Sequence, residues 1–236
     1  MTHFPGGIAA TLGVDLADLK IPPAAQGMSI GLFGGSFNPP HAGHSHVAEV
    51  ALTRLKLDRI WMMVTPGNPL KEQAGLPDLA TRIRATRRLV HDPRIIVTGF
   101  EATLGSPYSW VTVRHLQQTF PHVRFVWIMG ADNLAGFHRW QHWRRIAATL
   151  PIAVVDRPGS TLAAHSSPAA AMLMRNRLSE GETALLKSKP APAWIFVHAR
   201  HNPLSSTALR SQGQGLLPEA DAAPDGPPPS ATSDLP

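Results

Sequence analysis

Two histidines three residues apart, His41 and His44, are the most informative pair of side chains in this chain. The residues that lead into them are Gly34, Gly35, Ser36 and Phe37, followed by Asn38 and two prolines. An apolar run that enters glycines and then histidines indicates a strand, a tight loop and a helix start. Residues at i and i+3 share one helix face, so both imidazoles can point at one ligand. The pattern predicts an anion site, because free amides and the helix dipole favour negative charge at a helix start.

A second polar block lies late in the chain. Ser205, Ser206 and Thr207 open a predicted helix, and Arg210 follows about one turn later. Hydroxyl side chains at a helix start are typical N-caps. They can also bind phosphate oxygens, while Arg210 pairs its charge with the same anion. The two interpretations are compatible, since a capped helix start is itself an anion site.

Together these blocks resemble the nucleotidylyltransferase superfamily, whose signature is Gly-x-Phe with a His-x-Gly-His box and a late Ser-Ser-Thr block. Two further segments are similar to those of the bacterial nicotinate-nucleotide adenylyltransferase family. They are Pro66–Lys71 and Gly130–Leu134, the latter followed by Phe137, Trp140 and Trp143. The resemblance runs in order from about Met28 to Ser211.

The resemblance implies where ATP binds. The implied ATP site consists of Gly34, Gly35, Ser36, Phe37, His41, His44, Gly130, Asp132, Ser205, Ser206, Thr207 and Arg210. Within it, His41, His44 and Arg210 are the expected catalytic residues, and His44 lies nearest the α-phosphate. Asp132 is expected to hold the adenosine side through ribose or backbone contacts. The alternative role of Asp132 is a simple N-cap of the next helix.

The resemblance also implies a pocket for nicotinate mononucleotide. Its expected residues are Asn68, Lys71, Tyr108, Ser109, Thr112 and Trp140. We choose Trp140 to stack on the nicotinate ring, although Trp140 and Trp143 at i, i+3 are also typical of core packing. One departure concerns the family pattern Tyr-Thr-x-Asp-Thr, because Val111 stands here in place of the aspartate. This change leaves the local hydrogen bonding of the segment in question.

The expected reaction is adenylyl transfer from ATP to nicotinate mononucleotide, giving nicotinate adenine dinucleotide and pyrophosphate in NAD biosynthesis. The nucleophile is already an anion, so positioning and charge neutralisation replace an activating base. Mg²⁺ is expected to enter with ATP, held mainly by phosphates and water. No protein metal site is expected. His138 and His142 have a zinc-compatible spacing, but without a third ligand we interpret them as surface residues.

The chain is basic, with a formal charge of +6 and a calculated pI of about 10.5 over 236 residues. The basic residues are dispersed and not interleaved with aromatics, so we do not expect a nucleic-acid partner. Their densest group is Arg82, Arg84, Arg87 and Arg88 on one predicted helix. We interpret this group as a solvated helix face. A positive field would also steer anionic substrates into a cleft.

Cysteine is absent, which fits a reducing compartment. No apolar run approaches the roughly 18 residues that a membrane helix needs, and no secretory signal is visible. We therefore expect a cytoplasmic protein without a membrane partner. The sequence leaves open whether it is a monomer or a homodimer.

The elements expected around these motifs alternate between strand and helix. The predicted strands are Ser29–Phe33, Arg59–Thr65, Arg94–Gly99, Val123–Gly130, Ile152–Asp156 and Trp194–His198. The predicted helices are Gly43–Lys56, Leu79–His91, Tyr108–Phe120, Trp140–Leu150 and Ala169–Ser179. Continuous apolar strands alternating with helices predict an α/β, doubly wound parallel sheet of Rossmann-like nucleotidylyltransferase type. Ligands of such sheets bind beyond the carboxyl ends of the strands.

The chain divides into three expected parts. Residues 1–27 form a weakly structured N-terminal extension, in which Ile8–Leu19 could make a short helix. Residues 28–211 form the catalytic domain. Residues 212–236 contain too few large apolar side chains to offset the entropy of ordering, so we expect a disordered tail.

Four alternatives stay open. The nearest is another adenylyltransferase of the superfamily, such as the phosphopantetheine enzyme. A fragment of a class I aminoacyl-tRNA synthetase also has a His-x-Gly-His box. The same fold could serve as a non-catalytic nucleotide sensor, although both histidines and Arg210 are retained. A basic RNA-binding module has the least support.

Overall fold

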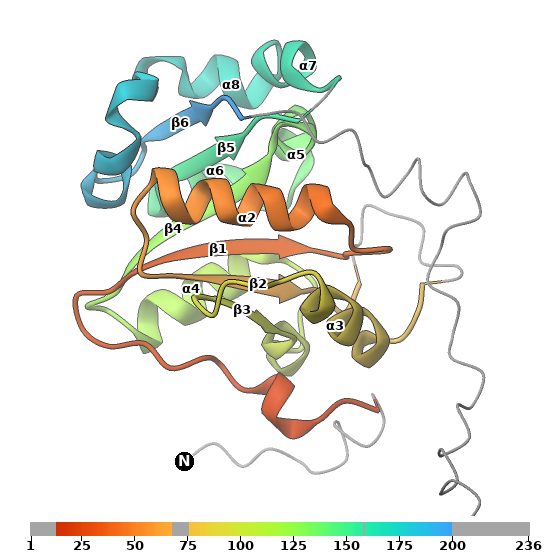
Figure 1. Ribbon diagram of the computed structural model, residues 1–236. Helices are drawn as coiled ribbons and strands as arrows, with labels where there is room; N and C mark the ends of the chain where they lie inside the picture. The colour runs from red at the N-terminus through yellow and green to blue at the C-terminus, as the bar shows by residue number, and fades with distance from the viewer. Residues whose placement is uncertain (1–12, 68–75, 158, 200–236) are drawn as a thin grey trace, which may run out of the picture.

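The computed structural model describes residues 13–67, 76–157 and 159–199, and its centre is a parallel sheet of six strands in the order β3-β2-β1-β4-β5-β6 (Figure 1). The strands are β1 (Ser29–Gly35), β2 (Arg59–Val64), β3 (Ile95–Thr98), β4 (Arg124–Gly130), β5 (Ile152–Val155) and β6 (Trp194–Val197). All six predicted strands are therefore confirmed. Their near-continuous burial explains the apolar runs, because both faces of the sheet are covered.

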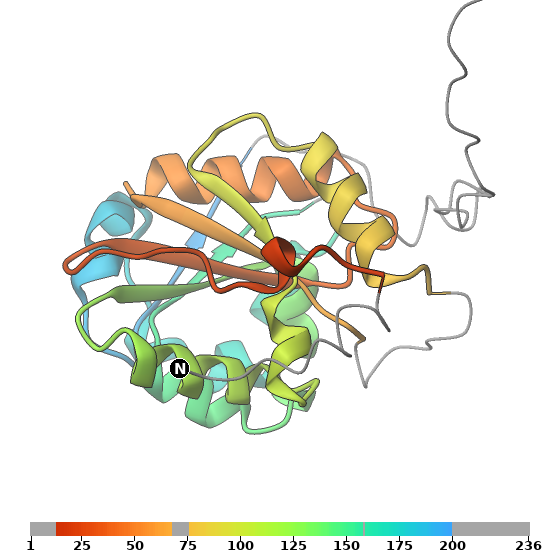
Figure 2. The same ribbon diagram turned by 90° about the horizontal axis from the view of Figure 1, so that it is seen from below.

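Helices cover both faces of the sheet. The α-helices are α2 (Ala42–Arg54), α3 (Leu79–Arg88), α4 (Ser109–Thr119), α5 (Ala131–Gly136), α6 (Trp143–Thr149), α7 (Thr161–His165) and α8 (Pro168–Leu173). The 3₁₀ helices are η1 (Leu16–Leu19), η2 (Phe100–Leu104), η3 (Phe137–Arg139), η4 (Met174–Asn176) and η5 (Glu180–Ser188). Figure 2 shows α2 and α3 on one side of the sheet and α4 on the other.

Each face of the sheet has its own hydrophobic core. Val47 and Leu52 of α2, together with Ile83 of α3, belong to one core. Val113 of α4 and Ile146 of α6 belong to the other. The alternate side chains of each strand point to opposite faces, so a single strand contributes to both cores.

The strand order reverses direction between β1 and β4. Strand β1 pairs in parallel with β2 on one side and with β4 on the other, and successive strands then lead outward in both directions. The chain leaves β1 at Gly35 and β4 at Gly130, so the loops that follow diverge to opposite faces. In sheets of this kind, ligands bind at such a reversal, beyond the carboxyl ends of the strands.

Two predicted helices differ from the observed ones. The helix expected from Trp140 begins at Trp143, because Trp140 is extended and His142 has a left-handed backbone. The helix expected over Ala169–Ser179 ends at Leu173, where the chain tightens into η4. Helices α5 and α7 and the 3₁₀ helix η5 were not predicted, since the two α-helices are only six and five residues long and η5 is a tighter coil.

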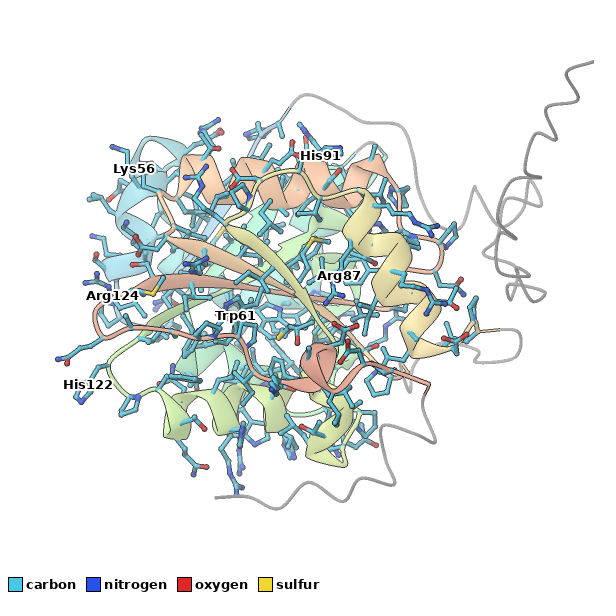
Figure 3. All side chains as sticks on the ribbon, turned by 60° about the horizontal axis from the view of Figure 1, so that its bottom comes forward. Lys56, Trp61, Arg87, His91, His122 and Arg124 are labelled. Atoms are coloured by element: carbon cyan, nitrogen blue, oxygen red, sulfur yellow. The ribbon has the colours of Figure 1, made fainter. Side chains whose placement is uncertain are left out.

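Part of the expected N-terminal extension packs on the domain. Of the expected helix Ile8–Leu19, the described residues form only η1, and the others lie outside the described part. Thr98 Oγ1 and the Gly99 amide both donate to the Asp18 carbonyl, at 3.2 and 2.8 Å. Arg87 reaches from α3 to the Asp18 carboxylate (Figure 3). In the described segments, no helix is long and apolar enough to cross a membrane.

We predict that two glycines of β1 differ in their tolerance of a methyl group. A Cβ on Gly31 would lie 2.3 Å from Ile128 Cδ1 and 2.9 Å from Leu57 Cδ1, within the core. Gly31→Ala should therefore lower the free energy of unfolding by about 1–3 kcal/mol. Gly34→Ala is the control, because its nearest contact would be an ordinary 3.6 Å to Trp127. Urea unfolding of both variants tests this, and equal losses would contradict the packing argument.

Candidate active site

His41 and His44 together cap the amino end of α2. His41 is the N-cap residue, and its Nδ1 accepts the Gly43 amide at 3.1 Å. The Nδ1 of His44 in turn accepts the backbone amide of His41 at 3.2 Å. The two rings lie 3.9 Å apart between centroids. The predicted helix start is thus confirmed, the two imidazoles lie side by side there, and they form a capping box.

This cap also fixes where the imidazole protons are. A ring nitrogen that accepts a hydrogen bond has no proton of its own, so a neutral His41 or His44 holds its proton on Nε2. Burial and the charge of Arg157 lower the pKa of His41 to about 4, while Asp132 works in the opposite direction. In the structure without ligand, His41 is therefore neutral near pH 7 and offers one Nε2–H donor.

The glycine-rich loop keeps its shape through Phe37. The positive φ of the loop, 45°, falls on Phe37 and on neither Gly34 nor Gly35. The buried Phe37 ring packs edge-on against His44, with centroids 4.9 Å apart. A Cβ on Gly35 would come within 3.0 Å of that ring. Gly35 is thus needed for packing beneath His44.

The end of β4 adds an ion pair to the site. Arg157 Nη1 lies 3.2 Å from both carboxylate oxygens of Asp132, and Arg157 Nη2 lies 3.4 Å from His41 Nε2. A Cβ on Gly130 would lie 2.4 Å from Asp132 Oδ1 and 2.6 Å from Arg157 Cδ. Glycine at this position therefore leaves room for the ion pair.

The alternative role of Asp132 as a helix N-cap is wrong. The N-cap of α5 is Gly130, with no side-chain cap, and Asp132 lies within the first turn. Its carboxylate is occupied by Arg157 instead. Our sequence reasoning missed Arg157. The signal that could have found it is its place directly after β5, at the same sheet edge as the other polar blocks.

A buried arginine ties the site loops together. The Arg82 guanidinium donates to the carbonyls of Ser36 and Thr65 at 3.0 and 2.7 Å. It also donates to the carbonyls of Pro66 and Pro77 at 3.2 and 2.9 Å. The loops after β1 and β2 are thus joined to the start of α3. Burial lowers the pKa of Arg82 to about 10, against the pull of Asp78, so the group stays cationic.

The expected solvated face of α3 is therefore wrong at Arg82, which is only 1% exposed. Arg84, Arg87 and Arg88 are exposed, as expected. Four arginines at helical spacing cannot all face outward, and the one that turns inward finds backbone carbonyls as partners.

On the expected acceptor side, Tyr108 is the N-cap of α4 and Ser109 is its first residue. The hydroxyl of Thr112 is buried and donates to Glu101 Oε1 at 2.6 Å. Val111, at the position of the family aspartate, is half-buried on the same helix. Among these residues, Tyr108 and Ser109 stand at the amino end of α4, while Thr112 faces the interior.

Glu101 is a second polar residue that the sequence reasoning missed. It is 5% exposed, and burial raises its pKa to about 7, although the bond from Thr112 acts in the other direction. An acidic residue directly after an apolar strand, between Phe100 and Ala102, was the available signal. Glu101 fastens η2 to α4 and so fixes the start of the segment expected to bind the acceptor.

Trp140 and Trp143 separate into two roles. The Trp143 ring is buried against Phe137, with centroids 5.7 Å apart. Trp140 is half-buried and makes edge contacts with Trp127 and Phe137, at 6.1 and 5.4 Å. Trp140 lies before the start of α6, so it is not part of the helix that contains Trp143.

Several expected site residues lie outside the described residues. They are Asn68, Lys71, Ser205, Ser206, Thr207 and Arg210. His142 is exposed and His138 is half-buried. Within residues 13–67, 76–157 and 159–199, no group of three metal-binding side chains is present.

Comparisons with known proteins agree on one family. A family model described as cytidylyltransferase-like matches residues 32–212. A protein of Agrobacterium fabrum is 59% identical over 184 residues, covering 78% of this chain and 98% of that protein. One of Rhizobium meliloti is 55% identical over 188 residues, covering 80% and 100%. Both carry the name "Probable nicotinate-nucleotide adenylyltransferase".

Solved structures agree in fold. The nicotinic acid mononucleotide adenylyltransferase of Plasmodium falciparum, complexed with NaAD, is 15% identical with a TM-score of 0.57. Its complex with APC is 14% identical with the same TM-score. Each alignment covers 78% of this chain and 83% of the other. At this identity the match concerns the fold alone, and it agrees with the Rossmann-like nucleotidylyltransferase architecture.

We predict that Arg82 is worth far more to stability than a surface arginine of the same helix. Arg82→Met leaves buried carbonyls without donors and should lower the free energy of unfolding by at least about 3 kcal/mol. Arg88→Met, at an exposed position, should change it by less than about 0.5 kcal/mol. Guanidinium chloride unfolding of both variants measures the difference. Similar small effects would restore the solvated-face interpretation.

Glu101 gives the protein a predictable pH dependence. The pKa of Glu101 is about 7 in the folded protein and 4.5 in the unfolded chain. The buried carboxyl is neutral at low pH, so its contribution to stability is full below pH 4.5. That contribution is lost as the pH rises through 7, because folding then requires a buried charge. Glu101→Gln keeps the acceptor for Thr112 but cannot ionise. At pH 8 this variant should be more stable than the wild type by roughly 2–3 kcal/mol.

The gain should shrink steadily towards pH 5, as measured by urea unfolding across that range. Glu49→Gln on the exposed face of α2 is the control, and it should show no comparable pH-dependent gain. A Glu101→Gln variant no more stable than the wild type at pH 8 would contradict the assignment.

Proposed function

Since the chain belongs to the cytidylyltransferase-like family, and within it to the nicotinate-nucleotide adenylyltransferases, we propose that it transfers the adenylyl group of ATP to nicotinate mononucleotide. The products are nicotinate adenine dinucleotide and pyrophosphate, a step of NAD biosynthesis. The observation that most supports this proposal is the capping box of His41 and His44 at the carboxyl edge of the sheet.

The phosphates of ATP bind at the amino end of α2. The cap uses the Nδ1 atoms of both histidines, and we assign the Nε2–H of each ring to phosphate oxygens. The phosphate site includes Gly34, Gly35, Ser36 and Phe37 in the loop before the box. We assign to the same site Ser205, Ser206, Thr207 and Arg210 of the late polar block, which lie outside the described residues. The adenosine lies towards Gly130 and Asp132.

The acceptor lies on the side of α4. We assign to nicotinate mononucleotide the residues Asn68, Lys71, Tyr108, Ser109, Thr112 and Trp140. Trp140 fits a stacking role better than Trp143, because only Trp140 keeps part of its ring exposed. Thr112 acts indirectly, since its hydroxyl is committed to Glu101.

The chemistry needs no activating base. A 5′-phosphate oxygen of nicotinate mononucleotide attacks the α-phosphorus of ATP, and the bond from that phosphorus to the bridging oxygen of the β-phosphate breaks. Pyrophosphate leaves with the electron pair, so no proton has to move. His41 and His44 donate hydrogen bonds to the phosphoryl oxygens, and Arg210 balances their charge. Magnesium supplies further charge neutralisation when it enters with the nucleotide.

The remaining expectations stay predictions. These are the limits 28–211 for the catalytic domain, the cytoplasmic location and the choice between monomer and homodimer. The phosphopantetheine reaction and a non-catalytic sensor are the alternatives that an assay must separate.

We predict that the purified protein releases pyrophosphate from ATP and magnesium with nicotinate mononucleotide as the preferred acceptor. The assay runs in parallel with nicotinamide mononucleotide and phosphopantetheine. Turnover with phosphopantetheine alone would keep the phosphate site and overturn the acceptor assignment. Binding of ATP without turnover of any acceptor would favour the sensor.

His44→Ala should lower kcat by roughly 100-fold or more, because one donor to the developing charge is lost. The Michaelis constant for ATP should change much less. His122→Ala, an exposed histidine at the opposite sheet edge, is the control and should keep wild-type kcat (Figure 3). A His44→Ala variant with near-normal kcat would refute the role of His44.

A further inference from the structure

Arg157 is placed at the junction of the two halves of the site. It follows β5 directly and lies between Asp132 of α5 and His41 of α2. Its side chain is 14% exposed, whereas that of Asp132 is 43% exposed. The guanidinium is thus mostly buried, and the carboxylate is the partner that faces solvent.

The charges of Arg157 and His41 bear on which ligand this part of the site can bind. His41 is neutral without ligand, so its ring brings no full positive charge to the start of α2. Arg157 is a cation whose Nη2 lies 3.4 Å from His41 Nε2, the same atom that we assign to phosphate; because both nitrogens carry protons, no hydrogen bond joins them. A polyphosphate that reaches His41 Nε2 therefore also comes within reach of the guanidinium.

We propose that Arg157 is a phosphate-binding residue of the ATP site, which exchanges its ion pair with Asp132 for the triphosphate when the nucleotide binds. This inference rests on the proposed function, because it deepens the assignment of ATP to this site. The exchange leaves Asp132 free for the ribose side of the nucleotide. It also makes the positive charge of Arg157 available to the arriving anion, whereas without ligand the Asp132 carboxylate neutralises that charge.

The planar guanidinium suits this exchange better than an ammonium. One rigid fork carries both Nη atoms, with Nη1 bonded to Asp132 and Nη2 3.4 Å from His41 Nε2. Phosphate oxygens match the same fork, so one partner can replace the other with little movement. Gly130 keeps the space in which the fork sits, since a side chain there would collide with Arg157 Cδ.

The test is calorimetric binding of three probes to the full chain: α,β-methylene-ATP, inorganic tripolyphosphate and adenosine. Arg157→Gln should weaken the two triphosphates by roughly 10- to 100-fold and leave adenosine almost unchanged. Arg88→Gln removes the same charge at an exposed position and should alter no affinity by more than about twofold.

A purely structural role for Arg157 predicts a different result. If Arg157 only holds Asp132 in place, adenosine should weaken as much as the triphosphates, and that outcome would overturn the proposal. Unchanged tripolyphosphate affinity would overturn it as well. If Arg157→Gln folds poorly, Arg157→Lys is the second variant. Its affinity for the triphosphates should fall by a smaller factor, because lysine keeps the charge but lacks the planar guanidinium.

A double-mutant cycle isolates the exchange itself. Asp132→Asn removes the competing carboxylate and should strengthen tripolyphosphate binding several-fold. The gain should be largely absent when Arg157→Gln is also present, because no guanidinium is left to be freed. An equal gain in both backgrounds would contradict the exchange.

Different results would contradict the proposed function and the proposed role of Arg157. Wild-type protein that neither binds the triphosphate probes nor turns over ATP would remove the proposed function. Wild-type protein that does both, with an Arg157→Gln variant that binds equally well, would remove only the role of Arg157.

Discussion

The amino end of α2 is the constraint on which the site depends. A helix start has amides that need acceptors, and here the acceptors are the rings of His41 and His44. The same hydrogen bonds that cap the helix therefore fix the orientation of both imidazoles and place their protons on Nε2. The cap uses Nδ1, and the proposed phosphate recognition uses Nε2 of the same ring, so the two roles do not compete. This makes the empty site ready for an anion before one arrives.

The surrounding structure keeps that helix start in register with the rest of the site. The buried guanidinium of Arg82 donates to backbone carbonyls of the loops after β1 and β2 and thereby joins these loops. Phe37 supports the ring of His44 from beneath, and Gly35 gives it space. On the other side of the switch point, Gly130 leaves room for the pair of Asp132 and Arg157. These contacts fix the arrangement of the proposed site where β1 and β4 diverge.

Much of this could be predicted from the sequence, and the failures at single residues share one physical cause, which is that their partners lie elsewhere in the fold. All six strands were found because each is a continuous apolar run buried on both faces. The histidine box was found because its meaning is local, within four residues. Arg82 was misjudged because its partners are backbone carbonyls of other loops, although its helical spacing already placed it on the buried side of α3. Arg157 and Glu101 were missed because their partners lie far away in sequence or inside the core, at Asp132, His41 and Thr112. Helix α5 was too short to show a period.

The most direct test of the account is the structure of the protein with α,β-methylene-ATP and magnesium. The account predicts the triphosphate against the amino end of α2, with Nε2 of both His41 and His44 about 3 Å from phosphate oxygens. The Nδ1 atoms should keep their bonds to the Gly43 and His41 amides. A triphosphate bound elsewhere, or box histidines that turn their Nδ1 atoms to the ligand and abandon the cap, would contradict it.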